Sequence, residues 1–202
     1  MDNREKMLKG LMYDPFQDGL CEDRTKAHAL CQQYNLLRDD QLEEKNKILD
    51  ELIPNRKEGV YIQGPLYVDY GKYIIIGKNS YMNFNFTALD CSLITIGDNV
   101  FIGPNVTLVT PVHPLRYQER NIFFNEETKQ YTDLEYSKPI TIKDNCWIAS
   151  NVTIIGGVTI GEGCVIGAGS VVTRDIPPHS LAFGNPARVI RKITEEDTVY
   201  KK

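Results

Sequence analysis

Hydrophobic positions follow two different periods along the chain, and the change between them separates a helical part from a second part. In residues 1–53, apolar side chains recur at spacings of three and four, the period of one helix face. The clearest stripe consists of Ala27, Leu30, Cys31, Tyr34 and Leu37. We therefore predict helices over this part, interrupted by the turn-rich segment YDPFQDGL that begins at Tyr13.

From about Ile74, hydrophobic positions repeat every six residues. The longest uninterrupted run consists of Ile142, Ile148, Ile154, Ile160, Ile166 and Val172. An earlier run consists of Ile96, Ile102 and Leu108, and we interpret Ile76 and Met82 as a still earlier copy of the pattern. A helix repeats at 3.6 residues and a strand at two, so a strict period of six indicates neither. It indicates a solenoid of short strands and tight turns, in which stacked coils supply one another's core.

The cysteines test this register. Cys146 and Cys164 are separated by three successive hexapeptides, which make one coil. We therefore expect two stacked, inward-facing thiols that fill a narrow core. The chain has five cysteines, an odd number without tight spacing, so we predict reduced thiols rather than a disulfide framework.

The six-residue register is lost over residues 111–139, which predicts an extruded loop. A loop of this length inside a compact repeat is usually functional or disordered. His113 lies at its root, and this position makes it the candidate for chemistry among the three histidines. We expect His28 to be a surface residue of the helical part and His179 to be a turn residue.

Composition and charge limit the partners. The chain is 42% hydrophobic and 25% charged, as in a globular domain, with a formal net charge of −4 and no block of Lys and Arg. Nucleic acid is therefore not an expected partner. No apolar run approaches the roughly 18–20 residues that a membrane span needs. The charged start MDNREKMLKG does not have the pattern of a signal peptide. We expect a cytoplasmic protein without a membrane partner.

Five segments resemble a known family. NFN, HPL, LEYSKP, WIAS and GNPARVIR, in this order and together with the hexapeptides, are similar to the sugar O-acetyltransferases of the hexapeptide-repeat superfamily, in the maltose and galactoside branch. The resemblance implies a mainly β fold, a left-handed parallel β-helix with an N-terminal helical cap and an extruded loop. The expected cap covers residues 1–58 and the expected β-helix residues 59–193. The family works as a homotrimer with active sites between subunits.

The resemblance also implies the reaction. Acetyl-CoA donates its acetyl group directly to a hydroxyl of a sugar such as maltose, glucose or a galactoside. His113 matches the general base, which takes the proton of the hydroxyl. Glu135 matches the residue that holds the imidazole, and Asn83 matches an asparagine beside the acceptor and the reacting carbonyl, with Asn85 as a weaker candidate. The positions that match the acceptor pocket are Asp14, Asp69, Asn83 and Asp90.

The donor side is carried over in the same way. The matching residues are Trp147, Ser150, Ala168, Thr173, Arg174, Arg188 and Arg191. Small side chains let the pantetheine arm lie against the prism, and arginines supply positive charge for the phosphates of coenzyme A. No metal is expected. Cys91 and Asp69 depart from the galactoside branch, which has a second acid and a serine there. The segment NIFFNEETKQYTD, residues 121–133, looks like an insertion, so acceptor specificity is the property most affected.

Three other interpretations remain open. A zinc hydratase on the same solenoid needs three converging histidines. A related acetyltransferase acts on a non-sugar acceptor, such as an antibiotic or an amino acid hydroxyl. A non-enzymatic solenoid serves as a structural or binding module. His113, Glu135 and the arginines occur together, which favours an enzyme over a structural or binding module, and the helical cap with YDP favours a sugar over an antibiotic as acceptor.

Overall fold

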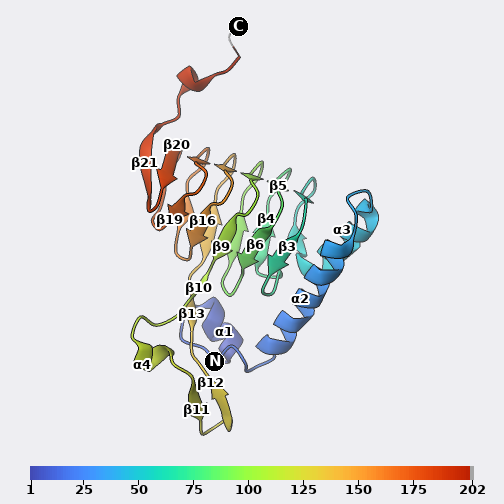
Figure 1. The fold of residues 1–202 in the computed structure, drawn as a ribbon, viewed down its shortest axis with the longest axis vertical. Helices are drawn as coiled ribbons and strands as arrows, with labels where there is room; N and C mark the ends of the chain where they lie inside the picture. The colour runs from blue at the N-terminus through green and yellow to red at the C-terminus, as the bar shows by residue number, and fades with distance from the viewer. Residues whose placement is uncertain (201–202) are drawn as a thin grey trace.

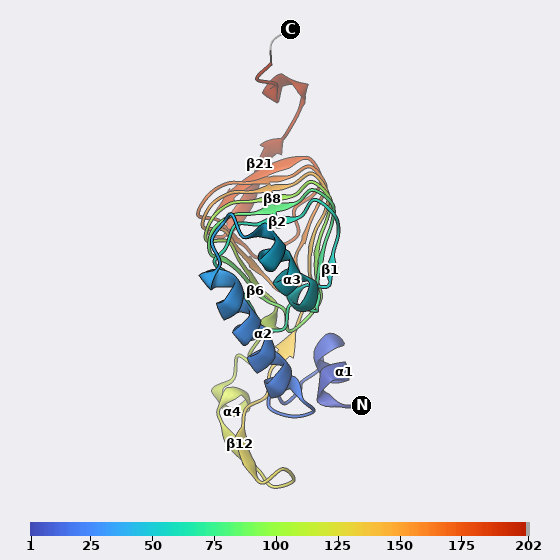
Figure 2. The same cartoon turned by 90° about the vertical axis from the view of Figure 1, so that its right-hand side faces the viewer.

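Short parallel strands wound into a three-sided prism form the body of the molecule; two helices lie at one end of the prism, and a third lies beside the root of the loop (Figure 1). The computed structural model describes residues 1–200. The helices are α1 (Asn3–Leu8), α2 (Leu20–Leu36) and α3 (Leu42–Leu52). Figure 2 looks along the prism and shows α2 and α3 lying across its end, where the first coil would otherwise expose its apolar interior. The predicted parallel β-helix with a helical cap and an extruded loop is confirmed.

The apolar stripe predicted on α2 faces the prism. Ala27, Cys31 and Tyr34 are at most 3% exposed, and Leu30 packs against the same core. The Tyr34 hydroxyl donates to the carbonyl of Ile62 at 2.5 Å, so the polar end of this buried ring is satisfied. The stripe therefore closes the solenoid without leaving an unpaired polar atom there.

Within residues 1–200, the solenoid has five coils of three strands, and the first, second and third strands of successive coils form sheets I, II and III. Sheet I contains β1 (Asn55–Arg56), β4 (Ile74–Ile76), β7 (Ile94–Ile96), β14 (Ile140–Ile142) and β17 (Thr159–Ile160). Sheet II contains β2 (Tyr61–Ile62), β5 (Tyr81–Met82), β8 (Phe101–Ile102), β15 (Trp147–Ile148), β18 (Val165–Ile166), β20 (Ser180–Gly184) and β21 (Ala187–Lys192). Sheet III contains β3 (Leu66–Val68), β6 (Phe86–Leu89), β9 (Thr107–Val109), β16 (Thr153–Ile155) and β19 (Val171–Val172). A 3-10 turn, η1 (Glu195–Asp197), follows β21.

The strand register stacks the repeated aliphatic residues inside the prism. In sheet I, Ile76 pairs with Ile96, Ile96 with Ile142 and Ile142 with Ile160, and all four are at most 1% exposed. Full burial of one such side chain contributes about 1.5–3 kcal/mol. The six-residue pattern therefore identified the core column correctly.

The first coils are longer than the later ones, and their extra residues lie at one corner. Ile74 pairs with Ile94 in an early coil, whereas Thr141 pairs with Thr159 in a later one, so the early turn takes up more of the chain than three hexapeptides. The additional residues lie where the chain passes from sheet III to sheet I, which we call corner III–I. A count of six misses these longer coils, so the pattern starts at β4 although the solenoid begins with β1.

Residues 111–139 leave the prism at corner III–I, as predicted (Figure 1). At the root, β10 (Pro111–Val112) and β13 (Tyr136–Ser137) pair antiparallel. Beyond them lie α4 (Tyr117–Arg120) and a hairpin formed by β11 (Phe123–Asn125) and β12 (Gln130–Thr132). The segment that looks like an insertion is this hairpin.

The two thiols stack as the period predicted. Cys146 and Cys164 are free, at most 1% exposed, and directly precede β15 and β18, whose first residues pair in register. A hydrogen bond with the Cys164 side chain is the largest cause that raises the pKa of Cys146. Both thiols also donate to backbone carbonyls at 3.1 Å, that of Gly161 for Cys146 and that of Pro177 for Cys164.

A glycine between two coils permits their close approach. A Cβ on Gly97 would lie 2.6 Å from the backbone nitrogen of Asp144 and 2.9 Å from the carbonyl carbon of Lys143. We expect Gly97→Ala to lower the free energy of unfolding by about 1–3 kcal/mol, because this overpacking pushes two coils apart. Thermal unfolding measures this loss. Gly169→Ala is the reference without overpacking: nothing lies within 4 Å of the added Cβ, so its smaller loss, about 1 kcal/mol, comes only from the positive φ of 73°. Equal losses in both variants would contradict overpacking.

Candidate functional site

His113 lies at the root of the loop, and strand pairing places Glu135 opposite it. Val112 pairs with Tyr136 in the antiparallel pair β10–β13, so the residue after Val112 faces the residue before Tyr136. Nε2 of His113 lies 3.7 Å from Oε2 of Glu135. The imidazole is 47% exposed. This corner therefore presents an imidazole that an incoming molecule can reach.

A second carboxylate faces the other ring nitrogen. Oδ2 of Asp133 lies 3.8 Å from Nδ1 of His113. Asp133 was not among the residues predicted from the sequence. It lies two residues before Glu135 in an extended segment, so both side chains point to the same face. Whichever ring nitrogen accepts a proton, the other faces a carboxylate, and both carboxylates stabilise the imidazolium that forms.

The segment between α1 and α2 reaches this corner and holds Glu135 through its other oxygen. The backbone of Tyr13 donates to the Glu135 carbonyl at 2.9 Å and accepts from its N–H at 3.2 Å. The Tyr13 hydroxyl donates to Oε1 of Glu135. Burial is the main cause that raises the pKa of Glu135, while Tyr13 and His113 favour its charged form. The carboxylate is thus buried, positioned and held by a donor.

Asp14, the next residue, ties the same segment to the hairpin. Its Oδ1 accepts from Thr132 Oγ1 at 2.8 Å and from the Phe16 N–H at 2.9 Å. Its Oδ2 is buried and has no hydrogen-bond partner among residues 1–200. An unpartnered buried carboxylate oxygen has free capacity to accept a hydrogen bond, for example from a substrate hydroxyl.

Asp69 and Cys91 form a further part of corner III–I. The Cys91 thiol donates to Oδ2 of Asp69 at 3.4 Å, and Nε2 of His28 lies 3.7 Å from Oδ1. A pocket of ≈ 580 Å³ is lined by Asp69 and by side chains of α2 and β3, with Gln32 and Tyr67 among them. His28 is exposed, as predicted, but it also lies beside this acid. The pocket offers space for a small molecule beside Asp69.

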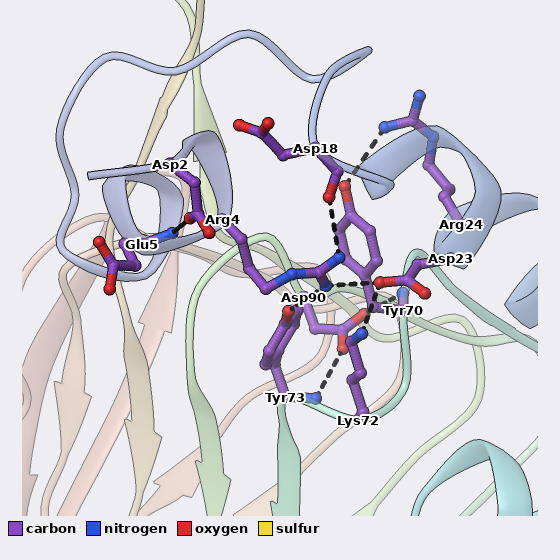
Figure 3. Close-up of polar contacts among 10 residues, drawn as sticks. All are labelled: Asp2, Arg4, Glu5, Asp18, Asp23, Arg24, Tyr70, Lys72, Tyr73 and Asp90. Carbon is purple, nitrogen blue, oxygen red and sulfur yellow. Dashed lines mark hydrogen bonds and ion pairs between the residues drawn. The ribbon is translucent and has the colours of Figure 1, made fainter.

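Asp90 does not open onto this pocket. It is 0% exposed, and its carboxylate accepts from the backbone N–H of Tyr70 at 2.8 Å and of Tyr73 at 3.2 Å (Figure 3). Burial raises its pKa to about 6. Asp90 therefore stabilises the longer corner of the first coil through the backbone. We do not propose it as an acceptor ligand, unlike Asp14 and Asp69.

An ion-pair cluster fastens the helical cap to the same corner (Figure 3). Asp23 of α2 lies 2.5 Å from Arg4 of α1 and 2.6 Å from Lys72 of the first coil. Arg4 also donates to the carbonyl of Asp18 at 3.1 Å. These contacts fix both ends of the segment that carries Tyr13 and Asp14.

Several of the predicted site residues, from both the acceptor side and the donor side, lie at a different corner. Asn83, Ser150 and Ala168 follow β5, β15 and β18, where the chain passes from sheet II to sheet III, and we call this corner II–III. Trp147 on β15 is 54% exposed beside it. Asn85 has φ 57° and bonds to the asparagine stacked one coil later at 2.9 Å, so its amide serves the turn.

The remaining candidates are dispersed. Thr173 and Arg174 follow β19 at corner III–I, and Arg188 and Arg191 lie on β21 of sheet II. Arg191 forms a two-pronged ion pair with Asp197 at 2.5 and 2.8 Å, so a phosphate would have to compete with Asp197. Within one chain, sheet III therefore lies between the corner that carries His113 and the corner that carries Asn83, Ser150 and Ala168.

Comparison with known proteins supports the resemblance seen in the sequence. The chain is 41% identical over 200 residues to the galactoside O-acetyltransferase of Escherichia coli (strain K12), which covers 99% of this chain and 94% of the relative. The chain belongs to the galactoside and maltose O-acetyltransferase family. Models of the "Maltose acetyltransferase hexapeptide capping motif" and of the "Bacterial transferase hexapeptide (six repeats)" match residues 6–56 and 139–174.

Solved structures of this family agree in fold. A galactoside acetyltransferase in complex with coenzyme A superposes with a TM-score of 0.89 and 39% identity, covering 100% of this chain and 96% of that chain. A maltose O-acetyltransferase from Clostridium difficile 630 gives 0.80 and 38%, covering 96% and 99%. The family assignment thus extends over the cap, the coils and the loop.

Two structural features are absent from the described residues: a metal-ligand cluster and a membrane-spanning helix. No group of three or more His, Cys, Asp and Glu side chains that could hold a metal ion occurs within residues 1–200. Over the same residues, no helix is both long and apolar enough to cross a bilayer.

Proposed function

We propose that this protein transfers the acetyl group of acetyl-CoA to a hydroxyl of a small sugar, with His113 as general base. The observation that carries this proposal is the pair of carboxylates around His113, 3.7 and 3.8 Å from its two ring nitrogens. A neutral imidazole takes the hydroxyl proton as the new bond forms, and adjacent carboxylates stabilise the resulting imidazolium.

The transfer proceeds in one chemical sequence. The acceptor oxygen attacks the thioester carbonyl while His113 removes its proton. The tetrahedral intermediate then expels the thiolate of coenzyme A, which takes the proton from the imidazolium. In this scheme, a backbone N–H near Ser150 and the amide of Asn83 stabilise the oxyanion.

Glu135 is the orienting carboxylate in this proposal. Its side chain is 11% exposed, against 24% for Asp133, and Tyr13 holds its second oxygen. Asp14 and Asp69 are the acceptor ligands, because carboxylates accept from neighbouring sugar hydroxyls. The unpartnered Oδ2 of Asp14 and the pocket beside Asp69 support this part.

The active site is completed between two copies of the chain, in a homotrimer. The support is the separation of His113 from Asn83, Ser150 and Ala168, which lie on two different corners of the prism. Threefold packing brings corner III–I of one copy to corner II–III of the next in closed symmetry. The relative crystallised with coenzyme A supports a donor site on this fold.

The experiment is a measurement of coenzyme A thiol release with a panel of acceptors. Maltose, glucose and a galactoside represent sugars, and a chloramphenicol-like compound and serine represent other acceptors. We expect turnover with at least one sugar and background rates with the other two. Turnover with a non-sugar acceptor alone would replace the sugar assignment by the alternative one. No thiol release with any acceptor would contradict the proposal.

A further inference from the structure

Tyr13 is a buried polar side chain to which the transfer mechanism assigns no step. It lies in the segment between α1 and α2, far in sequence from the loop that it contacts, and it is 1% exposed. An antiparallel backbone bridge joins it to Glu135, and its hydroxyl donates to Oε1 of the same residue. Two independent contacts therefore fix one carboxylate relative to the cap.

These contacts divide the two oxygens of Glu135 between two partners. Oε1 accepts from Tyr13, and Oε2 faces Nε2 of His113 at 3.7 Å. A phenol that donates to one oxygen stabilises the charged carboxylate and fixes its rotation, so the second oxygen stays directed at the imidazole. The thiol of Cys91 lies beside the Tyr13 hydroxyl and donates to Asp69.

We propose that Tyr13 is a positioning residue of the acetyl transfer, which keeps Glu135 charged and directed at His113 and thereby makes the helical cap a part of the catalytic machinery. This inference rests on the proposed role of His113. The segment between α1 and α2 then contributes to the reaction through Tyr13 as well as through Asp14. Tyr13 acts through Glu135 and touches neither substrate.

The contribution of Tyr13 depends on the charges around Glu135. The titratable groups that face this carboxyl are Tyr13, His113, Asp133, Asp69 and Cys91. Burial and the two aspartates favour the neutral acid, whereas Tyr13 and His113 favour the carboxylate. Without the Tyr13 hydroxyl, the carboxylate is protonated at higher pH, so a defect caused by its loss grows as the pH falls.

The test is a double-mutant cycle of Tyr13→Phe and Glu135→Gln, measured as kcat and KM for acetyl-CoA. We expect Tyr13→Phe to lower kcat roughly tenfold with KM for acetyl-CoA unchanged, since positioning of the base is lost and the donor corner is intact. In the Glu135→Gln background, the same change should lower kcat less than about twofold, because contributions that act through one residue are not additive. The ratio of wild-type to Tyr13→Phe activity should rise as the pH is lowered.

Tyr34→Phe is the matched control, because it removes the hydroxyl of another buried cap tyrosine, which donates to Ile62 at a distance from the loop. Its kcat should equal that of the wild type, and thermal unfolding should show both single variants folded. Equal losses from Tyr13→Phe in both backgrounds, or a pH-independent loss, would overturn the inference and leave Tyr13 a packing residue. Wild-type turnover by His113→Asn would instead overturn the proposed function on which it rests.

Discussion

Replacing His113 by asparagine is expected to lower kcat for acetyl transfer by about 10³-fold, or about 4 kcal/mol of transition-state stabilisation. The amide keeps part of the shape of the imidazole but cannot accept the proton of the acceptor hydroxyl at neutral pH. KM for acetyl-CoA should stay within about twofold, because the base contributes to the transition state rather than to donor binding. Steady-state release of coenzyme A with the best acceptor of the panel measures both constants.

His179→Asn is the control for this variant. His179 is exposed in a turn with φ 54°, a conformation that asparagine also adopts, so the same substitution should leave kcat unchanged. A His113→Asn variant with wild-type kcat would show that another group removes the proton. Equal losses in the two variants would assign the effect to general destabilisation.

Two inactive variants are expected to restore each other when they assemble together. His113→Asn removes the base at corner III–I, and Ala168→Trp places a large side chain on the exposed donor surface of corner II–III. If each site takes one corner from each of two copies, random association of equal amounts leaves about one site in four intact. We therefore expect co-expression to recover about a quarter of the wild-type activity, whereas each variant alone stays inactive.

The control combines both changes in one chain. Co-expression of His113→Asn with the double variant His113→Asn/Ala168→Trp supplies no intact base and should recover nothing. Absence of recovery in the first pair, with trimers shown by sedimentation, would place both halves of the site in a single chain. That outcome would contradict a site between copies while leaving the His113 mechanism untouched.

The sequence predicted those long-range contacts that arise from a pattern of hydrophobic residues repeated along the chain. Inward positions of a solenoid recur every six residues, so the period predicts that Ile142 stacks on Ile160. The loss of the period predicts the loop with His113 at its root. The helix stripe through Tyr34 is equally local. The early coils are longer than three hexapeptides and break the count, which is why the first coil was not found from the period.

Which residues take part in the candidate site depends on tertiary contacts that the hydrophobic period does not predict. Asp90 is acidic and close to Cys91 in sequence, yet its carboxylate is used by the backbone of Tyr70 and Tyr73. For Asp133, the sequence offered only its spacing from Glu135 as an indication that it lies near His113. Nothing in the sequence indicated that Tyr13 contacts Glu135. Which buried carboxylate faces a ligand and which serves a turn depends on the backbone donors nearby, and only folding brings them together.

By itself, the sequence determined the architecture and the family and led to the prediction of His113 as the base, because periodicity and motifs of adjacent residues can be read without knowledge of the fold. Only the tertiary structure decided that Tyr13 and Glu135 meet and that His113 and Asn83 lie on different corners. The physical reason is that a coil brings residues one full turn apart into contact at a regular spacing, whereas the cap and the loop reach the same corner through hydrogen bonds and ion pairs that span the chain.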